Sequence, residues 1–227
     1  MLSEPQIERY SRQIIVSQVG GRGQQALLSA TVAIVGCGDL SSAAAVYLAA
    51  AGVGRLTVSE PSPLAELERV NPDCRVSPLS SPLTRTAAEE MVRNCNVVLA
   101  SGAAHEVCAV LNAACLTQHT PLLWGDTTGS LGVVTVIAGD HPGSPCYTCV
   151  HTQLLRPLAA GNAIDPLAAA TAAFIGTLQA TEAIKLLLGL GPIATGRLLT
   201  YDAVAATFDE VAVARDPHCA TCAVVRP

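Results

Sequence analysis

The feature that most constrains the fold is a strand, a glycine-rich turn and a helix that lead into a second strand. Residues 31–36 (TVAIVG) are β-branched and apolar, and the turn sequence GCGDLS begins at the end of this run. A long alanine-rich stretch then ends at Gly52, and residues 55–59 (RLTVS) are typical of another strand. Such a unit joins parallel strands by a right-handed crossover. The sequence therefore predicts an α/β protein with a mostly parallel sheet.

The rest of the chain adds strands and helices to this unit. Apolar runs predict strands at residues 74–78, 97–100, 121–126 and 132–139, with a hairpin of two more at 196–213. Helical periodicity predicts helices at 5–18, 24–29, 87–94, 105–118 and 168–188, with the first two separated by Gly20, Gly21 and Gly23. We expect one Rossmann-like, doubly wound domain that consists of a helical arm (1–30), a core (31–140) and a C-terminal part with mixed strands (141–227).

Size and charge exclude several classes of function. The 227 residues suit one sizeable domain better than two, and half of them are hydrophobic. The 13 lysines and arginines are scattered and the net charge is −5, so we expect no nucleic-acid partner. The sequence shows no apolar run of ~20 residues that would span a membrane. It also begins without the apolar stretch of a signal peptide, so the expected location is the cytoplasm.

The glycine-rich turn partly fits a nucleotide-binding fingerprint. Gly36 and Gly38 occupy the first two glycine positions, which let the backbone approach a phosphate, but Ser41 replaces the third glycine. Glu60 ends the second strand, where an acid would bind a ribose. Asp39 falls at the helix start, where its carboxylate would cap backbone N–H groups and repel a phosphate. The turn therefore predicts either a degenerate nucleotide site or a Rossmann-like turn without a ligand.

Four of the nine cysteines form two CxxC pairs. Cys146 and Cys149 make one pair and Cys219 and Cys222 the other, which together offer four thiolates to a tetrahedral Zn²⁺. Four thiolates leave no open coordination position, so this zinc would be structural. Two redox-active pairs, or free thiols, are the alternatives. We expect the remaining cysteines to fill the core: Cys37, Cys74, Cys95, Cys108 and Cys115.

Several segments together resemble the ThiF/MoeB/HesA family, relatives of the ubiquitin-activating enzymes. They are residues 8–14 (ERYSRQI), 51–58 (AGVGRLTV), 175–187 (IGTLQATEAIKLL) and the two cysteine pairs. The resemblance implies an enzyme that uses ATP and Mg²⁺ to adenylate the C-terminal carboxylate of a ubiquitin-like or sulfur-carrier protein. It also implies a homodimer or a pseudo-symmetric heterodimer, and Arg12 matches an arginine that reaches into the partner's ATP site.

The chain departs from the family pattern where ATP would bind. The phosphate loop GxGGLG is GCGDLS here, and the segment that grips phosphates in the family is largely deleted after Glu60. The aspartate that binds Mg²⁺ corresponds to Ala103, and the crossover loop at 156–166 holds no cysteine. Loss of one electrostatic donor typically slows such a reaction by about 10²–10³-fold. We therefore expect no adenylation by this chain alone, and we regard ATP and Mg²⁺ as doubtful cofactors.

Three hypotheses about function follow. In the first, the chain is a non-catalytic subunit paired with an active homologue, into whose site Arg12 reaches, although Arg12 is equally explained as an exposed helix charge. In the second, a remodelled pocket adenylates a carrier or binds another nucleotide or a small metabolite. Its candidate polar groups are Glu60, His105, Glu106 and Asp126. In the third, the chain is a scaffold that binds a ubiquitin-like tail or a peptide without altering it.

Overall fold

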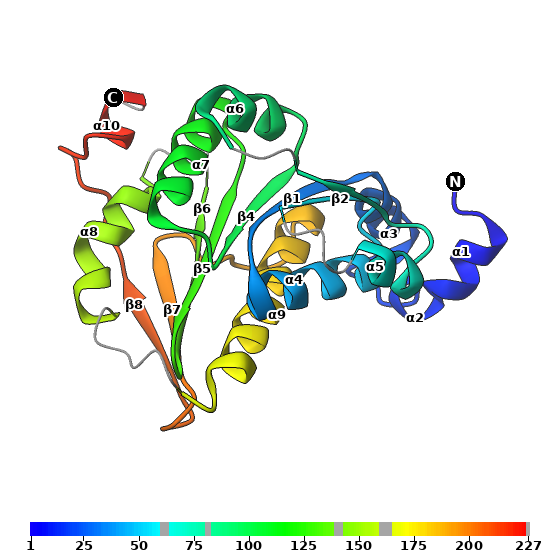
Figure 1. The fold of residues 1–227 in the computed structure, drawn as a ribbon. Helices are drawn as coiled ribbons and strands as arrows, with labels where there is room; N and C mark the ends of the chain where they lie inside the picture. Colours follow the sequence, from blue (N-terminus) through cyan, green and yellow to red (C-terminus); the bar gives the residue numbers. More distant parts are fainter. Residues whose placement is uncertain (60–63, 80–82, 139–142, 159–164, 226–227) are drawn as a thin grey trace.

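The computed structural model describes residues 1–59, 64–79, 83–138, 143–158 and 165–225, and an eight-stranded sheet organises them (Figure 1). The strand order is β3-β2-β1-β4-β5-β6-β7-β8. Parallel pairing joins β1 (Thr31–Gly36), β2 (Arg55–Val58), β3 (Arg75–Pro78), β4 (Val97–Ser101) and β5 (Leu122–Thr128). Antiparallel pairing adds β6 (Leu131–Ile137), β7 (Arg197–Asp202) and β8 (Thr207–Ala212). The predicted α/β fold with mixed C-terminal strands is confirmed.

Helices cover both faces of the sheet. On one face lie α4 (Gly38–Ala51) and α9 (Ala168–Leu188), with α3 (Gly20–Ser29) beside them; on the other lie α6 (Arg85–Arg93), α7 (His105–Gln118) and α8 (Tyr147–Leu158). Alternate residues of β1 enter the two cores, since Ala33 and Val35 face α6 and α7 whereas Val32 and Ile34 face α4 and α9. A strand buried on both faces must be apolar throughout, which explains the TVAIVG run.

Helix α9 is tied to the sheet by a buried amide. The Gln179 side chain donates to the carbonyl oxygens of Ala100 and Leu123, at 3.0 Å each, and accepts from the Ser101 hydroxyl at 2.7 Å. Gly125 leaves room for this amide, because a Cβ there would lie 2.8 Å from Gln179 Cδ. One side chain thus connects α9 to β4 and β5. None of the helices within the described ranges, α9 included, has the length and hydropathy of a membrane span.

The N-terminal arm differs from its prediction. Instead of one helix over residues 5–18, the chain forms α1 (Glu4–Arg9) and α2 (Ser11–Ile14), because the buried ring of Tyr10 interrupts the helix between them. The glycines expected to separate two helices form the first turn of α3 instead. Gly23 permits this turn to approach α9, since a Cβ there would lie 3.2 Å from Leu188 Cδ2.

Three helices were not predicted from the sequence. Helix α5 (Leu64–Val70) is short, α8 begins inside the first cysteine pair, and α10 (Cys222–Val225) begins at the last cysteine. The latter two begin within or at a cysteine pair, and the CxxC spacing by itself gives no indication of a helix start. The predicted hairpin at 196–213 is confirmed as β7 and β8, which pair from Arg197 opposite Ala212 to Asp202 opposite Thr207.

Replacing Gln179 by alanine should destabilise the fold strongly. The change leaves the hydroxyl of Ser101 and two buried carbonyl groups without their partner and opens a cavity, so we expect a loss of about 2–4 kcal/mol in the free energy of unfolding. Urea denaturation measures this loss. The matched control is Thr181→Ala, an exposed position on the same helix that should change stability by less than about 0.5 kcal/mol. Equal effects of the two substitutions would contradict the anchoring role of Gln179.

Candidate functional site

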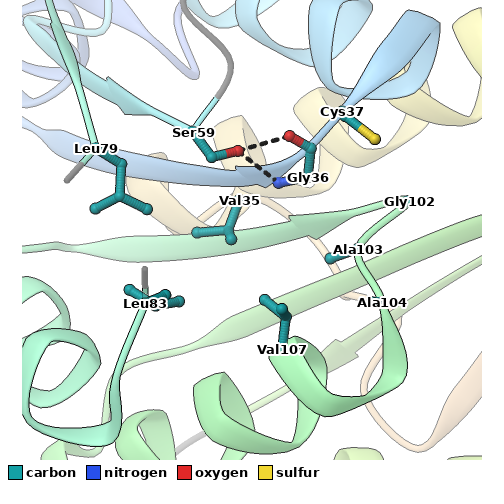
Figure 2. A pocket seen from close by; sticks show the side chains of 10 residues that line it. All are labelled: Val35, Gly36, Cys37, Ser59, Leu79, Leu83, Gly102, Ala103, Ala104 and Val107. Atoms are coloured by element: carbon teal, nitrogen blue, oxygen red, sulfur yellow. Dashed lines mark hydrogen bonds between the residues drawn. The ribbon is translucent and has the colours of Figure 1, made fainter. Parts of the chain in front are cut away.

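A cavity of about 270 Å³ opens at the carboxyl ends of β1 and β4 (Figure 2). The described residues that line it are Val35, Gly36, Cys37, Ser59, Leu79, Leu83, Gly102, Ala103, Ala104 and Val107. Gly36 is required where β1 passes β4, because a Cβ there would lie 1.8 Å from the carbonyl oxygen of Ser101. Gly38 then begins α4 with a φ of +77°, a conformation that favours glycine. The structure thus places Gly36 in the cavity lining and Gly38 at the start of α4, directly after the lining residue Cys37.

The cavity has apolar walls, and the polar backbone groups of Gly36 in its lining bond to a neighbouring side chain. The side chains of Val35, Leu83 and Val107 project into it in Figure 2. The Ser59 hydroxyl donates to the carbonyl oxygen of Gly36 at 2.6 Å and accepts from its N–H at 2.9 Å. None of the ten lining residues bears a charge. This part of the cavity therefore offers no charged side chain to a phosphate or to a magnesium ion.

Helix α4 begins differently from the prediction. Its N-cap is Cys37 rather than Asp39, and the Cys37 side chain makes no capping hydrogen bond. Asp39 lies one residue inside the helix and is exposed, so its carboxylate adds negative charge where the helix dipole would attract an anion. Cys37 is exposed and not the core residue that we expected. Three of the other expected core cysteines are buried and Cys95 is half-buried, and burial raises the pKa of the Cys108 thiol to about 12.

The structure describes some of the other predicted positions in this region and leaves the rest outside its described residues. Ala103, at the expected magnesium position, follows β4 and lines the cavity. Glu60 and residues 159–164 of the expected crossover loop lie outside the described residues. Residues 156–158 belong to α8, so helix replaces the beginning of that loop.

The two cysteine pairs converge on a single buried cluster. The sulfur atoms lie 3.8 Å apart between Cys146 and Cys149, 3.7 Å between Cys146 and Cys219, and 3.6 Å between Cys149 and Cys222. All four sulfur atoms lie within 4.8 Å of one another, and each residue is at most 4% exposed. The cluster could hold a metal ion, in agreement with the spacing of the sequence motif.

A group of polar aromatic side chains lies beside this cluster. His105 Nδ1 is 3.0 Å from the Tyr147 hydroxyl, and the rings of His105 and His151 have centroids 4.0 Å apart. Sequence reasoning identified His105 but missed Tyr147 and His151, because both lie on the unpredicted helix α8. Burial raises the pKa of the nearby Asp126 carboxyl. His105, Asp126 and the exposed Glu106 do not belong to the described lining of the cavity at β1 and β4.

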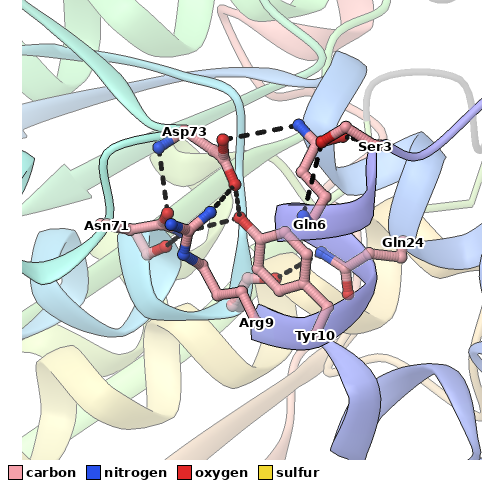
Figure 3. Close-up of polar contacts among 9 residues, drawn as sticks. Ser3, Gln6, Arg9, Tyr10, Gln24, Asn71 and Asp73 are labelled. Carbon is pink, nitrogen blue, oxygen red and sulfur yellow. Dashed lines mark hydrogen bonds and ion pairs between the residues drawn. The ribbon is translucent and has the colours of Figure 1, made fainter.

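The N-terminal arm is fastened to the segment after α5 (Figure 3). Arg9 forms an ion pair with Asp73, whose carboxylate also accepts a 3.0 Å hydrogen bond from the Tyr10 hydroxyl. The buried Asn71 amide donates to Tyr10 Oη at 2.8 Å and to the Ala49 carbonyl oxygen at 2.7 Å. Arg12 differs from these residues: it is exposed, and among the described residues it has no hydrogen-bond or ion-pair partner.

Sequence comparison identifies a protein family and several relatives of this chain. The sequence matches the ThiF family over residues 10–60 and 64–221. It is 33% identical to the SAMP-activating enzyme E1 of Haloferax volcanii, over 97% of this chain and 90% of that protein. It is 35% identical to the molybdopterin-synthase adenylyltransferase of Salmonella typhimurium, over 97% of this chain and 98% of that protein.

Solved structures support the fold. The chain is similar to Escherichia coli MccB in a crystal structure with ATP, with a TM-score of 0.74 and 19% identity. The match covers 94% of this chain and 74% of that one. It is also similar to PaaA, with a TM-score of 0.75 and 17% identity over 93% of this chain and 84% of that one.

Replacing Asp73 by alanine should loosen the arm that carries Arg12. The change removes the acceptor of both Arg9 and Tyr10 and leaves the partly buried Tyr10 hydroxyl with one fewer partner. We expect a loss of about 1–2 kcal/mol in stability, moderated by partial solvent exposure, and faster tryptic cleavage of residues 1–14. The control is Glu89→Ala, which removes the exposed ion pair with Arg85 and should leave cleavage of the arm unchanged. An arm in Asp73→Ala that resists trypsin as the wild type does would contradict this role.

Proposed function

Since the chain belongs to the ThiF family, we propose that it is a subunit of a complex that adenylates the C-terminus of a ubiquitin-like protein, a sulfur-carrier protein or a peptide. The relatives named above are adenylyltransferases or activating enzymes, and they align over nearly the whole chain. In this proposal the chain does not carry out adenylation alone. It pairs with an active homologue and completes that partner's site. A homodimer would contain two altered sites, so the heterodimer is the favoured assembly.

The observation that carries this proposal is the chemical character of the cavity. In adenylation a carboxylate attacks the α-phosphate of ATP and pyrophosphate leaves. Enzymes stabilise the negative charge on these phosphates with fixed cations and metal ions. The lining residues that the structure describes include no lysine, arginine, aspartate or glutamate, and alanine stands at the expected magnesium position. Asp39 adds a negative charge at the helix end that would face the phosphates. These features support loss of independent activity.

Arg12 supports the role as a partner. The residues around it are used within the chain, since Arg9 and Tyr10 hold the arm on Asp73. Arg12 itself projects from α2 into solvent, on an arm fixed by those contacts. A fixed arm lowers the conformational cost of presenting a guanidinium to a second chain. Contact with a partner chain would give the exposed Arg12 a role, whereas Arg9 already has one in its ion pair with Asp73.

We further propose that the cysteine cluster binds a structural zinc ion. Zinc–thiolate bonds are about 2.3 Å long, so a tetrahedral site places its sulfur atoms about 3.8 Å apart. The closest sulfur pairs here lie 3.6–3.8 Å apart, which fits that tetrahedron. Zinc would be held by Cys146, Cys149, Cys219 and Cys222, all buried, with no position left for a substrate.

Removal of this zinc should destabilise the C-terminal part of the protein. The purified chain should contain one zinc ion per molecule by elemental analysis, and a strong chelator should lower its melting temperature by several degrees. Cys146→Ser should abolish zinc binding, whereas Cys37→Ser, at an exposed cysteine outside the cluster, should preserve it. A chain that is folded and metal-free, with four free thiols in the cluster, would overturn the proposal.

Pyrophosphate exchange in a reconstituted complex tests the partner role. This chain alone should show no ATP–pyrophosphate exchange with a diglycine-ended carrier protein. A homologue whose own equivalent of Arg12 has been replaced by alanine should recover exchange when this chain is added. The Arg12→Ala variant should recover about 10²–10³-fold less, because one transition-state contact is missing. Arg93→Ala, an exposed arginine on α6, is the matched control and should behave as the wild type.

The same experiment distinguishes the other hypotheses. Robust exchange by this chain alone would show an active enzyme with a remodelled pocket. Carrier binding without exchange in any combination would favour a scaffold. Full recovery by the Arg12→Ala variant would overturn the role of Arg12 in the partner's site.

A further inference from the structure

We infer that Arg215 is the cation that stabilises the tetra-cysteine site and controls how firmly it retains its metal. This inference rests on the zinc site proposed above. Arg215 lies between the end of β8 at Ala212 and the second cysteine pair, outside both CxxC motifs. Its role is positional and electrostatic, since it contacts the ligands and not the metal.

The need for such a cation follows from charge. Four thiolates around a divalent ion carry a net charge of −2, and the four cysteines are at most 4% exposed. A buried charge is costly unless neighbouring groups compensate it by hydrogen bonds or opposite charge. The site therefore requires donors that approach the sulfur atoms from the surrounding protein.

The structure supplies these donors from two adjacent residues. The half-buried Arg215 donates from Nη2 to the Cys222 carbonyl oxygen at 3.4 Å, which places its guanidinium beside the second cysteine pair. The backbone N–H of Asp216 donates to Cys149 Sγ at 3.5 Å. The two donors thus reach one cysteine of each pair. Only Arg215 among them brings a full positive charge.

Arginine suits this position better than lysine. A guanidinium presents several N–H groups in a fixed plane, so it can bind the carbonyl oxygen of a ligand residue and keep its charge beside the thiolates. An ammonium would retain the charge but lose the shared geometry. The hydroxyl groups of Thr148 and Thr221 bond to each other at 3.0 Å and join the two pairs without adding charge.

Zinc release measures the role of Arg215. Zinc-loaded wild type, Arg215→Gln and Arg215→Lys are mixed with a chromophoric chelator and the release rate is followed. Loss of such a supporting partner typically weakens metal binding by about 10–100-fold, so Arg215→Gln should release zinc faster by that factor. Arg215→Lys should be intermediate, because the charge is kept. The matched control is Arg197→Gln, which removes another half-buried arginine that donates to a carbonyl oxygen and lies on β7; it should release zinc at the wild-type rate.

The outcomes separate this inference from the zinc proposal. Wild type without zinc would overturn the metal site itself, and this inference with it. Zinc-bound wild type and an Arg215→Gln variant with equal release rates would overturn only the role of Arg215. Equal release rates for Arg215→Lys and Arg215→Gln would also overturn it, because charge would then have no effect. If Arg215→Gln does not fold, Arg215→Met, which keeps the apolar stem and removes the charge, takes its place, and equal release rates for it and the wild type would refute the inference.

Discussion

The arrangement of this protein depends on how the carboxyl ends of its parallel strands are held. Gln179 binds carbonyl groups of β4 and β5 through one buried amide, and Gly36 allows β1 to pass the end of β4 at van der Waals contact. These two contacts fix the spacing of β1, β4 and β5 at the strand ends where the cavity opens. Ligands of doubly wound sheets bind in the crevice at such strand ends. The same contacts therefore position the cavity and hold α9 on the opposite side of the sheet.

The fixed parts of the molecule and the cavity between them differ in chemical character. The contacts of Arg9 and Tyr10 with Asp73 keep the arm in place, and the cysteine cluster closes the far end of the molecule. Between them, the described cavity has apolar walls and no charged side chain. The arm contacts therefore hold the exposed Arg12 at a fixed place on the molecule, outside the described cavity lining.

Much of the fold could be predicted from the sequence because its signals are local. The TVAIVG run is apolar throughout since both faces of β1 are buried, and the CxxC spacing reflects the reach of two sulfur atoms to one point. The failures have a common cause in tertiary contacts. Tyr10 interrupts the arm helix because its ring enters the core beside Asn71, and Gly23 lies inside α3 because α9 packs against it.

The site was less predictable than the fold. The sequence predicted that Gly36 ends the first strand and that Ala103 follows the fourth, and both positions line the cavity, because chain order alone determines them. It could not show that Cys37, and not Asp39, is the N-cap of α4, since the two positions differ by only two residues along the chain. Nor could it bring Tyr147 and His151 to His105, because the helix that carries them begins within a cysteine pair.

The cysteine cluster also has a consequence for the unfolded chain. Cys146 and Cys219 are separated by 73 positions, and the segment between them contains α9, β7 and β8. An ion that joins the two pairs would close this segment into a ring. Closing a ring of that size removes about 4 kcal/mol of conformational freedom from a disordered chain, by the relation used for covalent crosslinks. The unfolded segment that becomes α9 would then have fewer conformations open to it, although it lies outside both pairs of cysteines in the sequence.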